Sequence, residues 1–266
     1  MRGLRSRLDR VWRMLMPGLC FALFGLGGLT LSLVWFNLLL IFQRDRLARR
    51  TISASFRLFL AVVRGVGVLD YRFNNLDVLR AERGCLVIAN HPSLLDYVLL
   101  ASVMNETDCL VKSALLRNPF VSGVIRAADY LINSEADTLL AASQQRLAQG
   151  DTLLIFPEGT RTRVGEAITL QRGAANIAVR CNSAVRVVVI HCSERMLDKQ
   201  SNWYNVPPNK PVFTVDVRER INIHDFYDAS QHEPALAARQ LNRHMQHQLT
   251  TGLQSLSGTK DASALS

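Results

Sequence analysis

The sequence predicts an α/β fold: a largely parallel central sheet flanked by helices, with an N-terminal membrane-inserted helix or helical hairpin. Two observations predict this class. After residue 70, short apolar runs alternate with longer amphipathic segments, a pattern typical of strands and helices that alternate along the chain. Before them, residues 14–43 contain no charged side chain, and such a run is typical of segments inserted in a bilayer.

The chain of 266 residues, 48% of them hydrophobic, is long enough for one folded domain and an additional apolar segment. We expect a basic-flanked membrane anchor over residues 1–50 and a single α/β domain over residues 51–230. A C-terminal amphipathic helix and a polar, disordered tail at 257–266 are expected to make up residues 231–266.

The positive charge is concentrated at the N-terminus. Residues 1–50 hold nine arginines but only two aspartates, which places +7 of the net charge of +9 on the flanks of the apolar segment. A nucleic-acid-binding domain would spread such charge over its folded face, so this distribution favours anionic lipid headgroups and no nucleic acid. The five cysteines are scattered, which predicts neither a disulfide framework nor a metal site and is typical of a reducing compartment.

The apolar segment allows two shapes. Thirty residues of helix would extend about 45 Å, more than the roughly 30 Å core of a bilayer. It could be one tilted spanning helix, or a re-entrant hairpin bent near the cluster of Gly25, Gly27 and Gly28. Residues 55–68 alternate apolar side chains with Arg57 and Arg64, which fits a helix on the membrane surface or one packed on the domain.

The remaining elements follow from hydrophobic periodicity. Buried strands are expected at 85–90, 108–112, 130–133, 152–156 and 185–190, with an edge strand at 211–223. Helices are expected at 93–104, 136–149, 171–181 and 234–255. In such folds, functional sites gather at the carboxyl ends of the parallel strands.

Two polar motifs follow predicted strands. In the first, Asn90-His91-Pro92-Ser93 leads to Asp96 in the first turn of the next helix. One tight bend lets His91 and Asp96 face each other as a general base and the carboxylate that orients it, although Asp96 could instead only cap the helix. The second motif runs from Phe156 to Arg161, where a glycine permits an open turn and Arg161 offers a fork for a phosphate or carboxylate.

These motifs resemble the glycerolipid acyltransferase family, whose best-known members are the lysophosphatidic acid acyltransferases. The family's N-H-x-S-x-x-D motif is matched by Asn90, His91, Ser93 and Asp96, and its F-P-E-G-T-R motif by residues 156–161 without a gap. The resemblance covers roughly residues 55–220 and includes Lys112, where the family often has a lysine.

The resemblance implies acyl transfer without a metal, a cofactor or a covalent intermediate. His91 takes the proton of an acceptor hydroxyl, Asp96 orients His91, and the alkoxide attacks a thioester of coenzyme A or acyl carrier protein. The residues that would bind the substrates are Glu158, Gly159, Thr160, Arg161, Lys112 and Asn133. The implied acceptor is a lysophospholipid such as 1-acylglycerol-3-phosphate.

One departure bears on the acceptor. The family's second motif ends in an arginine that helps to hold the acceptor phosphate, and here the expected strand ends at Asn133. A neutral amide forms a weaker bond to an anion than a guanidinium does. An acceptor such as a lyso-aminolipid, a specialised glycolipid or an aryl polyene lipid is therefore an alternative. Two others are an inactive membrane-bound lipid-binding protein and a thioesterase.

Topology gives a further expectation. Acyl thioesters are cytoplasmic, so the domain should face the cytoplasm, at the inner membrane if the chain is bacterial. A spanning helix would then place the N-terminal arginines outside, against the positive-inside tendency, whereas a re-entrant anchor keeps both arginine clusters inside. The sequence therefore favours the re-entrant anchor.

Overall fold

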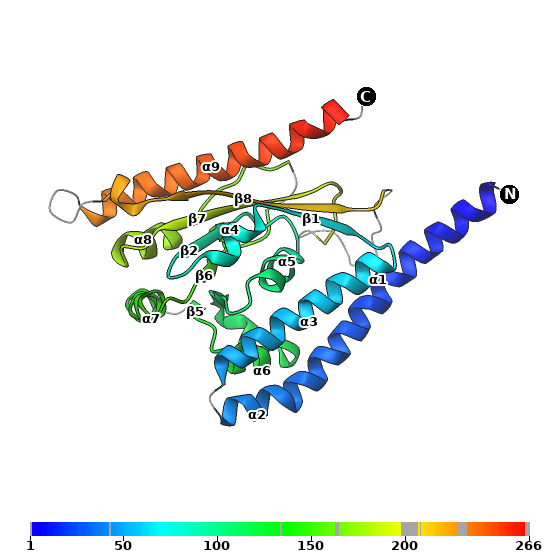
Figure 1. Cartoon of the computed structure of the whole chain (residues 1–266), viewed down its shortest axis with the longest axis horizontal. Coiled ribbons are helices and arrows are strands. Elements are labelled where there is room, and N and C mark those ends of the chain that lie inside the picture. The colour runs from blue at the N-terminus through cyan, green and yellow to red at the C-terminus, as the bar shows by residue number, and fades with distance from the viewer. Residues whose placement is uncertain are drawn as a thin grey trace.

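The computed structural model describes residues 2–42, 44–133, 135–162, 165–197, 207, 209–227 and 233–263. Its centre is a six-stranded sheet with the order β1-β8-β7-β2-β6-β3 (Figure 1). Every neighbouring pair is parallel except β7 and β8. This confirms the predicted α/β class. The strands are β1 (Asp70–Asn74), β2 (Leu86–Ala89), β3 (Asp108–Cys109), β6 (Leu153–Ile155), β7 (Val185–Cys192) and β8 (Val212–Ile221).

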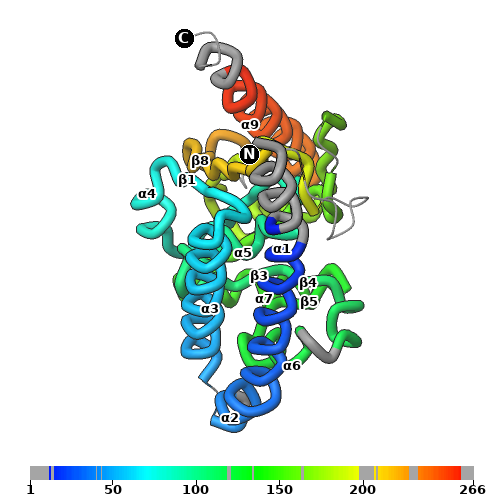
Figure 2. The backbone as a smooth tube through the Cα atoms, turned by 90° about the vertical axis from the view of Figure 1, so that its right-hand side faces the viewer, coloured from blue at the N-terminus to red at the C-terminus, as the bar shows by residue number. Residues whose placement is uncertain are grey.

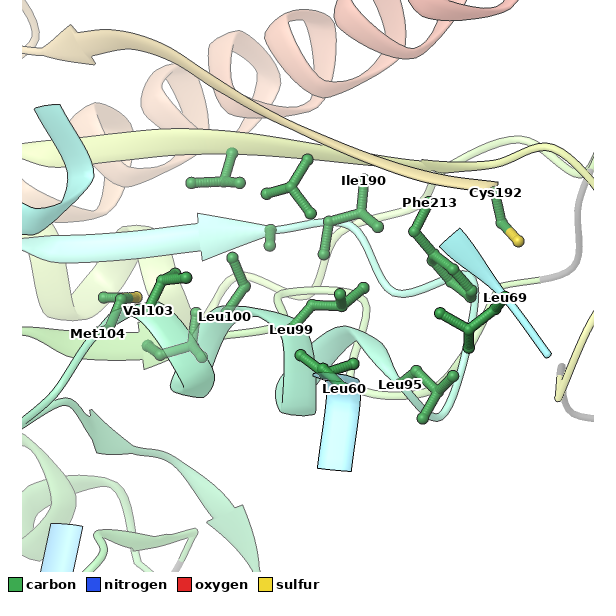
Figure 3. Close-up of a cluster of buried hydrophobic side chains, with 14 of the residues drawn as sticks. Leu60, Leu69, Leu95, Leu99, Leu100, Val103, Met104, Ile190, Cys192 and Phe213 are labelled. Carbon is green, nitrogen blue, oxygen red and sulfur yellow. The ribbon is translucent and has the colours of Figure 1, made fainter. Parts of the chain in front are cut away.

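The two faces of the sheet are buried by different helices, because successive residues of a strand point to opposite sides. On one face, Val87 and Val188 pack with α5 (Asp96–Val103) and α3 (Asp45–Gly65), as part of the cluster shown in Figure 3. On the other face, Ile88 and Val189 pack under the second layer. That layer consists of α7 (Ala136–Ala148), α8 (Gly173–Arg180) and α9 (Pro234–Ser263). Figure 1 shows α9 above the sheet, with α5 and α3 below it.

The expected edge strand lies inside the sheet. β8 is hydrogen-bonded on one side to β7 and on the other to β1, where Asp70 is paired with Val212. The prediction was wrong because β1 is only five residues long and contains charged residues, so it was not recognised as the strand that covers β8. The short α4 (Leu76–Ala81), which follows β1, was missed for the same reason.

The N-terminal segment forms a helical hairpin (Figure 2). α1 (Arg2–Leu33) runs unbroken through Pro17 and the three glycines, and α2 (Trp35–Ile41) follows after one residue. The chain then reverses into α3, so the bend lies after α2. The hairpin alternative was wrong in placing the bend at the glycines. Within the described residues, one stretch, Leu15–Leu39, is long and apolar enough to cross a membrane, with a mean hydropathy of 2.0.

The boundary expected at residue 50 falls within α3. This helix contacts both α1 of the hairpin and α5 of the domain. Arg49 is 2% exposed, and its guanidinium donates to the Ala128 carbonyl at 2.8 Å. It also forms ion pairs with Asp108 and Asp151, each at 3.4 Å. Of the two alternatives for the amphipathic segment, the structure shows the helix packed on the domain.

Two further helical segments support the hairpin. The 3₁₀ helix η1 (Ser113–Arg117) leads into α6 (Pro119–Ala127), and α6 packs on α1 and α2. The approach is close at Gly123, where a Cβ atom would collide with the Ser32 hydroxyl.

The end of the chain is more helical than expected. The 3₁₀ helix η2 (Ile223–Asp225) follows β8, and α9 continues to Ser263. Residues 257–263 therefore belong to this helix and do not form a disordered tail, whereas 264–266 lie outside the described residues. The close approach of α9 to the sheet occurs at Gly252, where a Cβ atom would lie 2.6 Å from Val189 Cγ2.

Candidate active site

The first motif lies at the carboxyl end of β2, in the turn that leads to α5. Asn90 fixes the start of this turn, because its side chain donates to the Ile190 carbonyl and accepts from the Ile190 N–H, both at 2.7 Å. β7 therefore holds the end of β2 on one side. The next residue, His91, leaves the sheet with its ring 20% exposed, which makes it accessible to a substrate.

His91 and Asp96 face each other across this turn, as the spacing predicts. His91 Nδ1 lies 2.8 Å from Asp96 Oδ2, and the same oxygen accepts the Ser93 N–H at 2.7 Å. The Asp96 carboxyl is fully buried, and burial raises its pKa although the bond to His91 opposes the shift. With Nδ1 facing a carboxylate, the imidazole carries its proton there, which leaves Nε2 as the basic nitrogen.

Ser93 has a structural place in the turn. Its hydroxyl donates to the Met196 carbonyl at 3.1 Å and accepts the Leu95 N–H at 3.3 Å. The carboxylate of Asp96 reaches back to the Ser93 N–H, as in a capping box, but the Ser93 hydroxyl bonds Leu95 and not Asp96. Ser93 is 1% exposed, so its hydroxyl is shielded from substrates.

The second motif meets the first because β6 is the parallel neighbour of β2, with Ile88 level with Ile155. Phe156 stacks on the His91 ring, with 4.3 Å between the ring centroids and 25° between the planes. Glu158 is buried, and its Oε1 accepts the His91 N–H at 2.6 Å. Its other oxygen accepts the Thr162 hydroxyl. The two loops are therefore joined directly at His91.

The environment of Glu158 changes its acidity. Burial raises the pKa of this carboxyl to about 7, against the bond from the His91 N–H, and the nearby Asp96 carboxylate adds to the rise. The partners of this carboxyl are the His91 backbone N–H and the Thr162 hydroxyl. Glu158 thus acts on the position of His91 and not on that of Arg161.

The remaining residues of the second motif form an open turn. Gly159 has a φ of +69°, a conformation that favours glycine, and its N–H bonds the Phe156 carbonyl at 3.0 Å. Thr160 is exposed. Arg161 Nη1 donates to the Leu197 carbonyl at 2.8 Å, and its charge lowers the pKa of Asp96 against the larger effect of burial.

Lys112 and Asn133 lie on a separate two-stranded sheet formed by β4 (Val111–Lys112) and β5 (Ile132–Asn133). They are level with each other in its register, and both are exposed. β4 directly continues the path of β3, which is the parallel neighbour of β6. Lys112 therefore follows the carboxyl end of β3, which is two strands away from β2 in the sheet order, and Asn133 is its partner on β5.

Sequence reasoning missed the contributions of four residues. Phe156 gave no signal beyond its place in the motif, and Thr162 follows the motif directly. The carbonyls of Met196 and Leu197 could not be found from residue type, because backbone groups give no sequence signal. Among the residues that the structure describes, no three His, Cys, Asp or Glu side chains gather closely enough to hold a metal ion.

Comparisons with known proteins point to acyltransferases. Residues 70–193, which include both motifs, match a model of the acyltransferase family. A 1-acyl-sn-glycerol-3-phosphate acyltransferase of Helicobacter pylori is 30% identical over 112 residues, 40% of this chain and 47% of that protein. One of Pseudomonas aeruginosa is 25% identical over 157 residues, 57% of this chain and 60% of that protein. The alignments thus span about half of these relatives' lengths.

A solved structure shares the fold. The crystal structure of the 1-acyl-sn-glycerophosphate acyltransferase of Thermotoga maritima superposes with a TM-score of 0.64, covering 96% of this chain and 99% of that one. The sequence identity is 18%. The similarity extends over nearly the whole chain and therefore includes the N-terminal hairpin as well as the sheet.

Proposed function

We propose that the chain is a member of the glycerolipid acyltransferase family and transfers a fatty acyl group from a thioester to the hydroxyl of a lysophospholipid-like acceptor. The observation that carries this proposal is the His91–Asp96 pair, bonded at 2.8 Å beside the turn that holds Glu158 and Arg161. A base with an orienting carboxylate, next to a cation, suits proton removal from a hydroxyl on an anionic lipid.

The transfer can be written with the residues of this chain. His91 Nε2 takes the hydroxyl proton while the acceptor oxygen forms a bond to the thioester carbonyl carbon. The tetrahedral intermediate then collapses, the C–S bond breaks, and His91 returns the proton to the leaving thiolate. Asp96 stabilises the imidazolium between these steps. The acyl donor in this proposal is a thioester of acyl carrier protein or of coenzyme A. The proton transfers require neither a metal nor a cofactor.

The proposed acceptor is 1-acylglycerol-3-phosphate or a related lysolipid. The planar guanidinium of Arg161, held at the Leu197 carbonyl, suits the recognition of a phosphate. Lys112, at the same edge of the sheet, supplies a second positive charge. The relatives' names, which specify 1-acyl-sn-glycerol-3-phosphate, support this acceptor.

A second acceptor class is favoured by one observation. Asn133 occupies the place of the family's phosphate-binding arginine and is exposed beside Lys112. Either a lyso-aminolipid or a specialised lipid acceptor would need less charge there. If position 133 sets the choice, Asn133→Arg should raise activity on lysophosphatidate relative to other lysolipids. An unchanged ratio would remove the argument for this class.

We also propose that the hairpin attaches the protein to the cytoplasmic face of a membrane. Its turn is lined by exposed apolar side chains, among them Val34, Ile41 and Phe42 at 69%, 74% and 64% exposure. Acyl thioesters are cytoplasmic, so the domain that carries this hairpin should face the cytoplasm. An N-terminal tag protected from external protease in intact cells would support this orientation, and cleavage there would contradict it.

The deciding experiment is an acyl-transfer assay on the purified full chain. Acyl carrier protein and coenzyme A thioesters are offered against a panel of lysolipids, and His91→Ala serves as the control. A lipid product that is lost in the variant supports the transferase and identifies the acceptor. Steady thioester hydrolysis without an acceptor would indicate a thioesterase. No product and no thioester loss would favour a lipid-binding protein.

A further inference from the structure

The segment that follows β7 folds back over the first motif. Its last two described residues, Met196 and Leu197, have buried side chains, and their carbonyls point to the two motifs. The Met196 carbonyl accepts the Ser93 hydroxyl at 3.1 Å. The Leu197 carbonyl accepts the Leu94 N–H at 3.1 Å and Arg161 Nη1 at 2.8 Å. One backbone oxygen thus joins the turn that holds His91 and Asp96 to the arginine of the second motif.

The backbone of Leu197 is in an unfavourable conformation. Its φ is +53°, in the left-handed region. Among the described residues, the other non-glycine positions with positive φ are Asn75, Asp129 and Asn182, and short polar side chains tolerate this region. A leucine does not, and such conformations persist only where the surroundings hold them, often at functional sites. Here, the conformation directs the carbonyl of Leu197 toward Arg161.

Arg161 needs such a support because an arginine side chain has many rotamers. Fixing one of its N–H groups on a rigid carbonyl reduces the conformational freedom that is lost when the guanidinium binds an anion. The guanidinium lies near the His91–Asp96 pair, since its charge lowers the pKa of Asp96.

We propose that Leu197 is a positioning residue, whose left-handed backbone conformation holds the Arg161 guanidinium in place for the anionic group of the acceptor. This inference rests on the proposed function, because it concerns how the same site selects its acceptor. It assigns the role to the backbone of Leu197 and not to its side chain.

Two substitutions separate backbone from side chain. Leu197→Ile keeps the apolar volume, but a β-branched residue strongly disfavours positive φ. Leu197→Asn gives up the apolar side chain but tolerates the left-handed region. If the backbone matters, Leu197→Ile should raise the KM for 1-oleoyl-lysophosphatidate about tenfold, the scale of one charge-assisted bond, while the KM for the thioester stays unchanged. Leu197→Asn should stay near the wild type.

The anion dependence supplies the control. 1-Monooleoylglycerol lacks the phosphate, so Leu197→Ile should not weaken its use. In an Arg161→Gln background, Leu197→Ile should have little further effect, because the group that it positions is absent. The opposite order, with Leu197→Asn impaired and Leu197→Ile normal, would mean that only side-chain packing matters and would overturn the proposal.

Binding of 1-oleoyl-lysophosphatidate in nonionic detergent micelles, measured by calorimetry, distinguishes this inference from the proposed function. Wild-type binding that Leu197→Ile weakens and Leu197→Asn retains would support the positioning role even if no acyl transfer occurred. Acyl transfer with equal lysophosphatidate KM and affinity in all three proteins would overturn the positioning role alone. A wild type that neither binds nor acylates the lysolipid would overturn both.

Discussion

Replacing Arg49 by methionine removes the charged group that joins the hairpin to the domain. The guanidinium is buried between two carboxylates, Asp108 at 0% and Asp151 at 8% exposure, and it also bonds the Ala128 carbonyl. Without it, these two carboxylates keep only Arg146 and the exposed Arg46 as cationic partners among the described residues. Breaking a buried pair by removing one partner typically costs about 3–5 kcal/mol. This is a large part of a total stability of about 5–15 kcal/mol.

The neighbouring residue on the same helix gives a matched control. Arg50 forms an ion pair with Glu106, but its side chain is 65% exposed. Arg50→Met makes the same change in charge and should cost at most about 1 kcal/mol, because water screens exposed pairs. The free energies of unfolding of both variants can be measured by urea denaturation in nonionic detergent, followed by circular dichroism.

The pH dependence adds a second readout. Burial raises the pKa of Asp108 to about 6, although Arg49 lowers it, so Arg49→Met should raise it further. A carboxyl with a raised folded pKa favours the folded state when protonated, and this stability is lost as pH rises through that pKa. The deficit of Arg49→Met should therefore be larger at pH 7.5 than at pH 5. If Arg49→Met were as stable as Arg50→Met at pH 7.5, the buried pairs would not hold the hairpin.

Three other variants test the site and the packing. Asp96→Asn should lower kcat by about 10²–10⁴-fold with little change in KM, because the amide cannot stabilise the imidazolium; unchanged kcat in the acyl-transfer assay would exclude this role. Glu158→Gln should gain thermal stability relative to the wild type between pH 5.5 and 8, since ionisation of a carboxyl with a pKa of about 7 destabilises the wild-type fold over that range; a Tm difference independent of pH would contradict the raised pKa. Gly252→Ala should cost about 1–3 kcal/mol because its Cβ would lie 2.6 Å from Val189 Cγ2, whereas Gly258→Ala, with open space around it, should stabilise α9 by up to about 1 kcal/mol in the same urea experiment.

Local patterns were sufficient for the centre of the molecule. The strands β2, β6 and β7 are continuous apolar runs, and each was predicted within two residues of its observed ends. The spacing of His91 and Asp96 also predicted their contact, because only four residues separate them and the turn between strand and helix brings them together. In these places, the information lies within a few neighbouring residues.

Long-range contacts explain the errors. Arg49 was grouped with charges that flank a membrane segment, but its partners lie 59 and 102 residues further along the chain. The first residues of α3 were missed for the same reason, because no local pattern indicates that Arg49 pairs with buried carboxylates. The bond from the His91 N–H to Glu158 spans 67 residues, and the support of Arg161 by a backbone carbonyl spans 36.

The place of β8 between β1 and β7 determines when the sheet can be completed during synthesis. Asp70 pairs with Val212, so the first strand to leave the ribosome stays unpaired until the last one follows, 142 residues later. β7 likewise keeps a free edge until β8 arrives. Contacts so distant in sequence slow folding, and unpaired edges can join other chains. A nascent chain that stops before residue 212 would leave the edges of both β1 and β7 without their β8 partner. Pairing of β8 is therefore the step that protects this protein from aggregation.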